Sequence, residues 1–222
     1  MFEGPWRLVP SRRRRRIMFR IGGDGVLEVL TPPGISERSV RTLIADNTAL
    51  IEEMYRRFAQ RPRGAQYDFV EGEKFPLWDK KLTLKISARL ALMTEEELIL
   101  PRGSRAEMLQ KAEQLYRRKA AELLPDRCRF FGSPFQLLPA SIGVTGAATR
   151  WGSCNSRKHI SFCWKIMLLP GELADYIICH ELAHLQFLNH SPAFWQLTEA
   201  LCPEALAKRK RLRALPPLWP EN

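Results

Sequence analysis

The hydrophobic and polar positions change their period several times along the chain, and each period predicts a kind of element. Apolar and polar residues alternate over residues 17–21 and return over 26–30 after a glycine-rich turn, which predicts a strand pair. From Ser36, a good N-cap residue, apolar positions recur every three or four residues to about Ala59. This second pattern predicts one amphipathic helix.

Shorter patterns follow in the middle of the chain. Short strands are predicted at residues 69–70, 82–86, 98–100 and 159–166. Ser104 and Glu107 have the spacing of a capping box, and the apolar positions after them predict a helix. We expect that helix to end before Pro125, because proline cannot donate the backbone hydrogen bond that a helix interior needs.

The last third of the chain reads as a series of helices. Apolar positions over residues 173–183 predict the first, with Asn189 as its expected terminator. Ser191-Pro192 then supplies an N-cap and a proline at the first helical position. A final basic helix is expected over residues 204–214. Because strands and helices alternate in blocks, we predict an α+β fold with a small, largely antiparallel sheet.

The length of 222 residues suits one sizeable domain or two small ones, and the 45% hydrophobic content is ordinary for a globular protein. We divide the chain into a basic N-terminal arm at 1–15 and an N-terminal α+β region at 16–103. The first part of the arm, residues 1–11, is expected to be mobile. A C-terminal core is expected at 104–222, and it should form one continuous domain with 16–103.

Charge is distributed unevenly along the sequence. The net charge is +11, which favours contact with polyanions. The basic residues concentrate in the run Arg12–Arg16 and in the tail from Lys208 to Arg213, whereas residues 166–207 contain no Lys or Arg. The basic ends therefore predict an association with nucleic acid, next to the simpler interpretation of solvated charged segments.

Cysteine usage and hydropathy bear on the compartment. The five cysteines form no C-x-x-C pair, so neither a disulfide framework nor a zinc finger is indicated. No stretch approaches the roughly 20 apolar residues of a membrane span. We expect a cytoplasmic protein without a membrane partner.

The candidate chemistry lies in the sequence His180-Glu181-Leu182-Ala183-His184. Positions i and i+4 share one face of a helix, so His180 and His184 can direct two imidazole nitrogens at one metal ion. Glu181 lies about 100° further around the helix, where it can reach a water molecule but not the metal itself. This spacing is typical of a zinc hydrolase with Glu181 as the catalytic carboxylate.

A third ligand has to come from outside the motif. His190 follows the expected helix end at Asn189, so a short turn can bring a third imidazole back to the zinc. The competing candidates are Glu199 and Glu204 on the following helices. Glu181 itself lies among apolar neighbours, where a carboxylate without a partner is costly to bury.

Three functions stay open at this point. The first is a zinc metallopeptidase, in which Glu181 as general base takes the proton of a zinc-activated water that attacks a peptide carbonyl. The second is a metal-dependent nucleoside triphosphate pyrophosphatase, with phosphates held by Arg150, Lys158 or Lys165. The third is a nucleic-acid-associated binding module with a structural or vestigial zinc site.

The fourth histidine, His159, is expected to be a solvated loop residue.

Three motifs together resemble the YgjP-like metallopeptidase family, a relative of the SprT-like zincins. They are Trp151-Gly152-Ser153-Cys154, the H-E-L-x-H sequence from His180, and Asn189-His190-Ser191-Pro192-x-Phe194-Trp195, in the order of the family pattern. The resemblance implies a minimal zincin-like catalytic core at the C-terminal end, with His180, His184 and His190 on zinc. It does not settle the substrate, which the metallopeptidase hypothesis predicts to be a peptide or protein.

Overall fold

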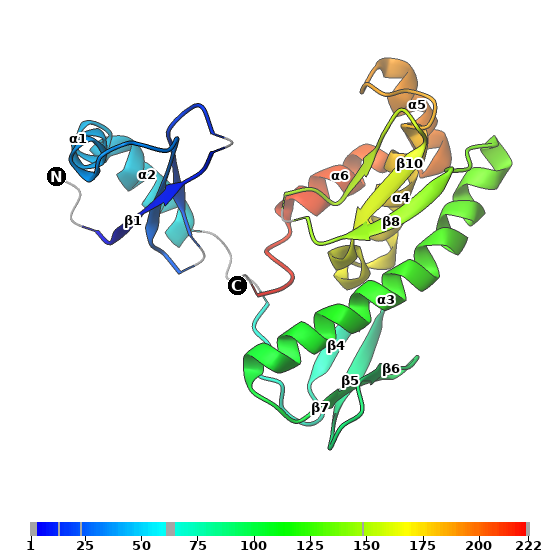
Figure 1. Ribbon diagram of the computed structural model, residues 1–222. Coiled ribbons are helices and arrows are strands. Elements are labelled where there is room, and N and C mark those ends of the chain that lie inside the picture. Colours follow the sequence, from blue (N-terminus) through cyan, green and yellow to red (C-terminus); the bar gives the residue numbers. More distant parts are fainter. Residues whose placement is uncertain (1–3, 13, 23, 61–64, 148, 221–222) are drawn as a thin grey trace. The chain divides into compact units, whose positions relative to one another are not determined.

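The computed structural model describes residues 4–12, 14–22, 24–60, 65–147 and 149–220. The chain divides into two compact units, residues 1–64 with 220–222, and residues 65–219. The α+β class is confirmed, because six α-helices accompany three small sheets in the described residues (Figure 1). Four of the seven strand pairings described are antiparallel and three are parallel, so the sheets are mixed. The boundaries drawn from the sequence at residues 15 and 103 stay predictions.

The first unit contains a three-stranded sheet in the order β1-β3-β2. The strand pair predicted from the sequence is confirmed as β2 (Met18–Ile21) antiparallel to β3 (Leu27–Thr31). Strand β1 (Trp6–Pro10) pairs in parallel with β3, so part of the expected mobile arm belongs to a sheet. Trp6 and Leu8 pack against the small core of this unit, which explains why the segment is held.

The prediction of a single helix after Ser36 is wrong, because two helices occupy that range. Ser36 is the N-cap as predicted, and its hydroxyl accepts from the backbone of Ser39 at 3.1 Å. Helix α1 (Glu37–Asp46) ends at Asn47, and α2 (Thr48–Ala59) begins directly after it. The Asn47 side chain donates to a backbone carbonyl one turn earlier at 2.8 Å, which is how Asn competes with continued helical pairing.

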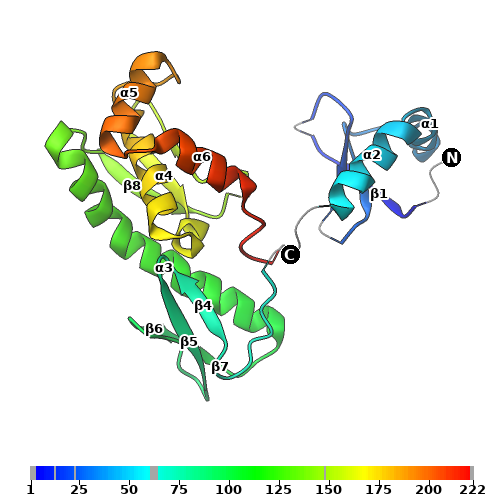
Figure 2. The same cartoon turned by 180° about the vertical axis from the view of Figure 1, so that it is seen from behind.

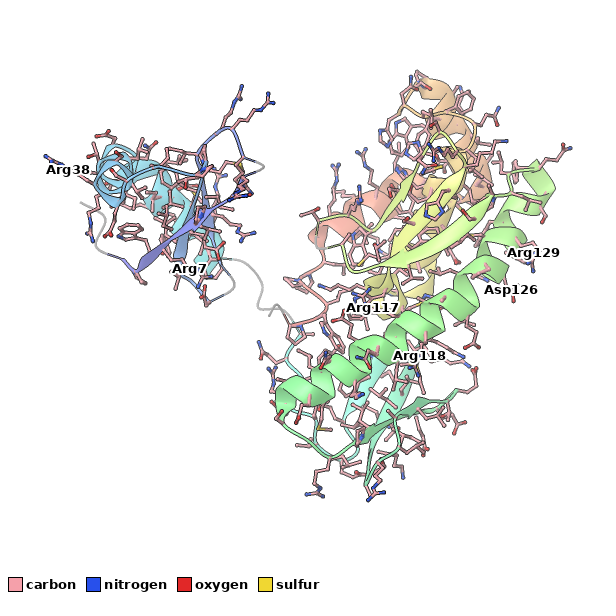
Figure 3. The ribbon with its side chains drawn as sticks, viewed as in Figure 1. Arg7, Arg38, Arg117, Arg118, Asp126 and Arg129 are labelled. Carbon is pink, nitrogen blue, oxygen red and sulfur yellow. The ribbon has the colours of Figure 1, made fainter. Side chains whose placement is uncertain are left out.

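A charged cluster ties the strands of the first unit together. Glu28 on β3 is only 6% exposed and contacts Arg7 and Arg20 from the two flanking strands. Arg7 also pairs with Asp24 at 2.6 Å, and Figure 3 labels its position in this unit. Hydrogen bonds from Arg7 and then Arg20 hold the pKa of Glu28 below its usual value. The sheet therefore keeps one nearly buried carboxylate charged through its neighbours.

The second unit is built around the long helix α3 (Arg105–Gly132), which lies between two sheets (Figures 1 and 2). The sheet that precedes it in the chain has the order β4-β5-β7-β6, with β4 (Lys74–Leu77), β5 (Lys80–Ser87), β6 (Leu92–Met93) and β7 (Glu97–Pro101). The sheet that follows has the order β8-β10-β9, with β8 (Ser141–Thr145), β9 (Gly152–Cys154) and β10 (His159–Cys163). Short 3-10 turns occur at Ser133–Phe135 and Trp164–Leu168.

Helix α3 does not end before Pro125, as the sequence predicted, but continues through it to Gly132. The capping box is present, since Ser104 accepts from the backbone of Glu107, and the Glu107 carboxylate accepts from the backbone of Ser104. Beyond the proline, Cys128 continues the apolar face and is fully buried. Packing of this face on both sides of Pro125 outweighs the one backbone hydrogen bond that proline removes.

Three helices complete the second unit: α4 (Gly171–Ala183), α5 (Pro192–Leu201) and α6 (Ala205–Ala214). Helix α4 ends six residues before Asn189, so the expected terminator lies in the following loop. Asp79, in the turn between β4 and β5, accepts from the Gly171 backbone at 2.8 Å and so caps α4. Arg127 on α3 binds Asp175 on α4 through two hydrogen bonds of 2.7 and 2.6 Å. The helix that carries the histidine motif is thus fixed at its start and along one side.

An aromatic cluster closes the core of the second unit. Trp219 is 3% exposed, and its ring lies 5.2 Å from Tyr67 and 5.1 Å from Trp164 between centroids. Tyr67 in turn stacks on Phe75 at 4.4 Å. The cluster therefore joins the last residue of this unit to strand β4, to the segment before it and to the 3-10 turn after β10. In the described part of the chain, no helix is both long and apolar enough to span a membrane.

Replacement of Trp219 tests this core. Trp219→Ala should lower the free energy of unfolding by about 3–5 kcal/mol, because it leaves a cavity among buried aromatic rings. Urea unfolding monitored by circular dichroism measures the loss. Leu206→Ala, on a side chain that is 59% exposed, should change stability by about 0.5 kcal/mol or less. Equal effects of the two substitutions would contradict this description of the core.

Candidate metal centre

Helix α4 brings the two motif histidines together on one face, as the sequence predicted. His184 lies just past the last helical residue, but its backbone keeps right-handed helical angles of φ −67° and ψ −15°. The i and i+4 relation therefore survives, and the rings of His180 and His184 lie 4.9 Å apart between centroids. Both side chains are half-buried.

His190 returns to this face from the loop that follows α4. The next residue, Ser191, caps α5 by accepting from the Phe194 backbone at 3.3 Å, which fixes the chain directly after the histidine. The His190 ring lies 5.1 Å from His180 and 4.9 Å from His184 between centroids. One ligand atom from each of the three histidines lies within 4.8 Å of the others.

The spacing of the imidazole nitrogens suits a tetrahedral metal ion. The Nε2 atoms of His180 and His190 lie 3.2 Å apart. Two nitrogens bound to zinc at 2.0–2.1 Å in tetrahedral geometry lie about 3.3 Å from each other. The Nδ1 atom of His184 donates to the Phe187 carbonyl at 2.8 Å, which leaves its Nε2 lone pair free for a metal. The donor set therefore fits zinc.

The surroundings lower the pKa of two of these imidazoles, His180 and His190, and so favour the neutral form that a metal ligand needs. Burial is the main cause that lowers the pKa of His180 to about 3, and the neighbouring charge of His184 adds to it. The pKa of His190 is also lowered, first by burial and then by the charge of His184. His180 Nδ1 is buried without a hydrogen-bond partner among the described residues. Neutral rings with free lone pairs are available to a cation at neutral pH.

Glu181 lies beside this cluster in an apolar setting. It is 5% exposed, and its Oε2 atom has no hydrogen-bond partner in the described part of the protein. Burial raises the pKa of Glu181 to about 7, against the opposing charge of Arg150. The backbone of β9 packs on this side chain so closely that a Cβ atom on Gly152 would lie 2.6 Å from Glu181 Cγ. A buried carboxylate oxygen without a partner is costly, and a water molecule held at the metal would satisfy it.

Phe194 and Trp195, at the end of the motif that begins with Asn189 and His190, pack directly against the histidines. The fully buried Phe194 ring lies 4.5–4.9 Å from all three imidazoles between centroids. Trp195 stacks on His190 at 5.7 Å with an interplanar angle of 23°. The motif that follows His190 thus supplies the packing that orients the third imidazole.

A cavity of about 250 Å³ adjoins the histidines. Its lining includes His180, Glu181 and His190, together with Trp151 just before β9 and apolar side chains from α4 and α6. Arg209 and Arg213 of α6 also line it, although the sequence places them in a basic tail outside the stretch without Lys or Arg that contains the motif. Their spacing of four residues on a predicted helix was the signal that both would face the same way. What the sequence could not give is the contact of α6 with α4.

The other candidate residues take different places. Glu199 accepts from the backbones of Glu204 and Ala205 at 2.6 and 3.0 Å, so it caps α6. Neither Glu199 nor Glu204 belongs to the metal-ligand cluster of the described residues. His159 hydrogen-bonds through its two ring nitrogens to Ser141 and Ser161 at 2.7 and 3.0 Å. It therefore lies on strand β10 and not in a solvated loop.

Three histidines around one point, with a buried carboxylate beside them on α4, are the arrangement of a metal-dependent hydrolase. The family model described as "YgjP-like, metallopeptidase domain" matches residues 15–215, and the chain belongs to this family. No curated protein matches the chain significantly. Among solved structures, the metallopeptidase zymogen of Pyrococcus abyssi abylysin is similar, with 19% identity and a TM-score of 0.39. That match covers 43% of this chain and 99% of the other.

The contact between Gly152 and Glu181 can be tested by a double-mutant cycle. Gly152→Ala should lower the free energy of unfolding by about 1–3 kcal/mol, because the added methyl group overlaps Glu181. In a Glu181→Ala background most of this cost should disappear, since the overlapping atoms are gone. Urea unfolding of the four proteins measures the coupling. An undiminished cost in that background would show that Glu181 does not pack on Gly152.

Proposed function

We propose that this protein is a zinc peptidase in which His180, His184 and His190 hold the metal and Glu181 is the general base. The observation that carries the proposal is the convergence of three imidazoles on one point beside a buried carboxylate oxygen that has no hydrogen-bond partner among the described residues. Family membership supports a peptide or protein as the substrate. One line of support is local geometry, and the other is a family match over residues 15–215, which include the histidine motif.

Each residue has a defined task in this proposal. A bound zinc would supply Lewis acidity to a water molecule and to the substrate carbonyl, which makes the water acidic near pH 7. Glu181 accepts the proton of the attacking water and passes it to the leaving amine. Its raised pKa suits a group that must both take and release a proton near neutral pH. Gly152 leaves room for the carboxylate, and Phe194 holds the imidazole rings in place.

The pyrophosphatase alternative finds less support. It requires cations that hold phosphates next to the metal, and Arg150, Lys158 and Lys165 were the candidates. None of the three is among the residues that line the cavity beside Glu181. Arg209 and Arg213 do line it, so the family match to a metallopeptidase domain is what favours the peptidase. Nucleic-acid association through the basic ends stays a prediction, as does a cytoplasmic location.

The ligand assignment predicts one zinc ion per chain. His184→Ala and His190→Ala should each lower zinc affinity by several orders of magnitude, because a two-histidine site lacks a third protein ligand. Elemental analysis after dialysis and competition with a chromophoric chelator measure occupancy and affinity. His159→Ala, which removes the only histidine outside the cluster, is the matched control and should retain full occupancy. Full occupancy in His190→Ala would show that the third ligand is another group.

The role of Glu181 predicts a separation of metal binding from turnover. Glu181→Gln should keep one zinc per chain and lose about 100-fold or more of the rate of casein hydrolysis, since it removes the general base. Fluorescently labelled casein and mass spectrometry of the products measure the rate. Glu172→Gln makes the same change on the same helix at an exposed residue that pairs with Arg211, and it should keep the wild-type rate. Wild-type turnover by Glu181→Gln would rule out this role.

A further inference from the structure

Two arginines reach the cavity beside the histidine cluster without a carboxylate to neutralise them. Helix α6 carries five basic residues, and four of them divide between two faces. On one face, Lys208 donates to the Pro203 carbonyl at 2.8 Å, and Arg211 pairs with Glu172 at 2.5 Å. Arg209 and Arg213 lie one turn apart on the other face and line the cavity. Neither forms a salt bridge within the described part of the chain.

Arg209 is held in a fixed position. Its guanidinium carbon lies 4.8 Å from the centroid of the Trp195 ring, in a cation–π contact. Trp195 is itself stacked on His190, so the guanidinium is positioned relative to a proposed zinc ligand. The side chain is half-buried, which strengthens its interaction with any anion that enters. A partly desolvated guanidinium without an acidic partner is an anion site.

The remaining walls of the cavity limit what kind of anion can enter. Trp151, Tyr176, Ile177 and Leu212 supply largely apolar surface next to the two arginines. The volume of about 250 Å³ is below the roughly 300–1,000 Å³ of pockets for drug-sized ligands. One amino-acid residue with an acidic group fits this space better than a whole nucleoside triphosphate.

We infer that Arg209, supported by Arg213, is a specificity site that binds a carboxylate of the peptide substrate next to the bond to be cut. This inference rests on the proposed peptidase function and adds the class of peptide that the site selects. The carboxylate is either an Asp or Glu side chain or the free C-terminus of a short peptide. Both present the planar pair of oxygens that a guanidinium binds through two parallel hydrogen bonds.

Peptide binding to the zinc-loaded Glu181→Gln protein tests the inference without turnover. The probes are fluorescein-labelled hexapeptides that carry Glu or Gln at each position in turn, each made as the free acid and as the C-terminal amide. Fluorescence anisotropy gives the dissociation constants. We expect a carboxylate at one position to tighten binding about tenfold, as for a charge-assisted hydrogen bond. A Glu-for-Gln effect identifies a side chain, and an acid-for-amide effect identifies the C-terminus.

Variants of α6 assign that preference to one residue. Arg209→Gln should abolish the tenfold preference, and Arg209→Lys should restore only part of it, because an ammonium lacks the planar fork. Arg211→Gln makes the same change two residues away on the face that binds Glu172, and it should keep the full preference. Arg213→Gln, at an exposed position, should weaken the preference and serves as the test if Arg209→Gln does not fold.

Several results would overturn the inference. They are equal binding of all peptides, a preference that persists in Arg209→Gln, and tighter, Arg209-dependent binding of inorganic tripolyphosphate than of any peptide. Casein hydrolysis by the wild-type protein separates this failure from that of the proposed function. If casein is cut but no carboxylate is preferred, only the specificity site is wrong. If casein is not cut and no peptide binds, the peptidase function fails and the specificity site fails with it.

Discussion

The burial of helix α4 is the constraint on which the site depends. Ten of its thirteen residues are buried, so the helix is covered on nearly every side and not along a single stripe. Its first backbone amide donates to Asp79, which lies in the turn between β4 and β5. Arg127 of α3 forms hydrogen bonds to Asp175 of α4. Every polar group on such a helix has to find a partner or bear a cost. The groups left over are His180 Nδ1 and one oxygen of Glu181, both at the proposed metal centre.

The same burial gives these groups their chemistry. Desolvation penalises charge, so it favours neutral His180 and at the same time raises the pKa of Glu181. A metal ion needs the first effect, because only a neutral imidazole has a lone pair to donate. A general base that later acts as an acid needs the second. In the proposed function, the burial of the motif helix in the core therefore prepares both the ligand His180 and the base Glu181.

The sequence was sufficient wherever structure is decided over a few residues. Ser36, Ser104 and Ser191 cap helices as predicted, and the spacing of His180 and His184 puts both rings on one face. It was insufficient where distant segments compete with local preference. Pro125 favours a helix end, but the fully buried face around it is paired with other elements, and α3 continues. Strand β1 likewise depends on pairing with β3, about 20 residues away, which no local pattern shows.

Charge is the clearest case of this difference between sequence and space. The histidine motif lies in a stretch without Lys or Arg, yet Arg209 and Arg213 line the cavity beside it. The charge of Arg150 also opposes the rise in the pKa of Glu181. The sequence alone suggests that this tail is a free basic segment. Because α6 packs against α4, its basic residues have different surroundings. Lys208 and Arg211 have partners within the protein, and two other arginines face the cavity. A polyanion that bound this tail would therefore compete with whatever anion the cavity holds.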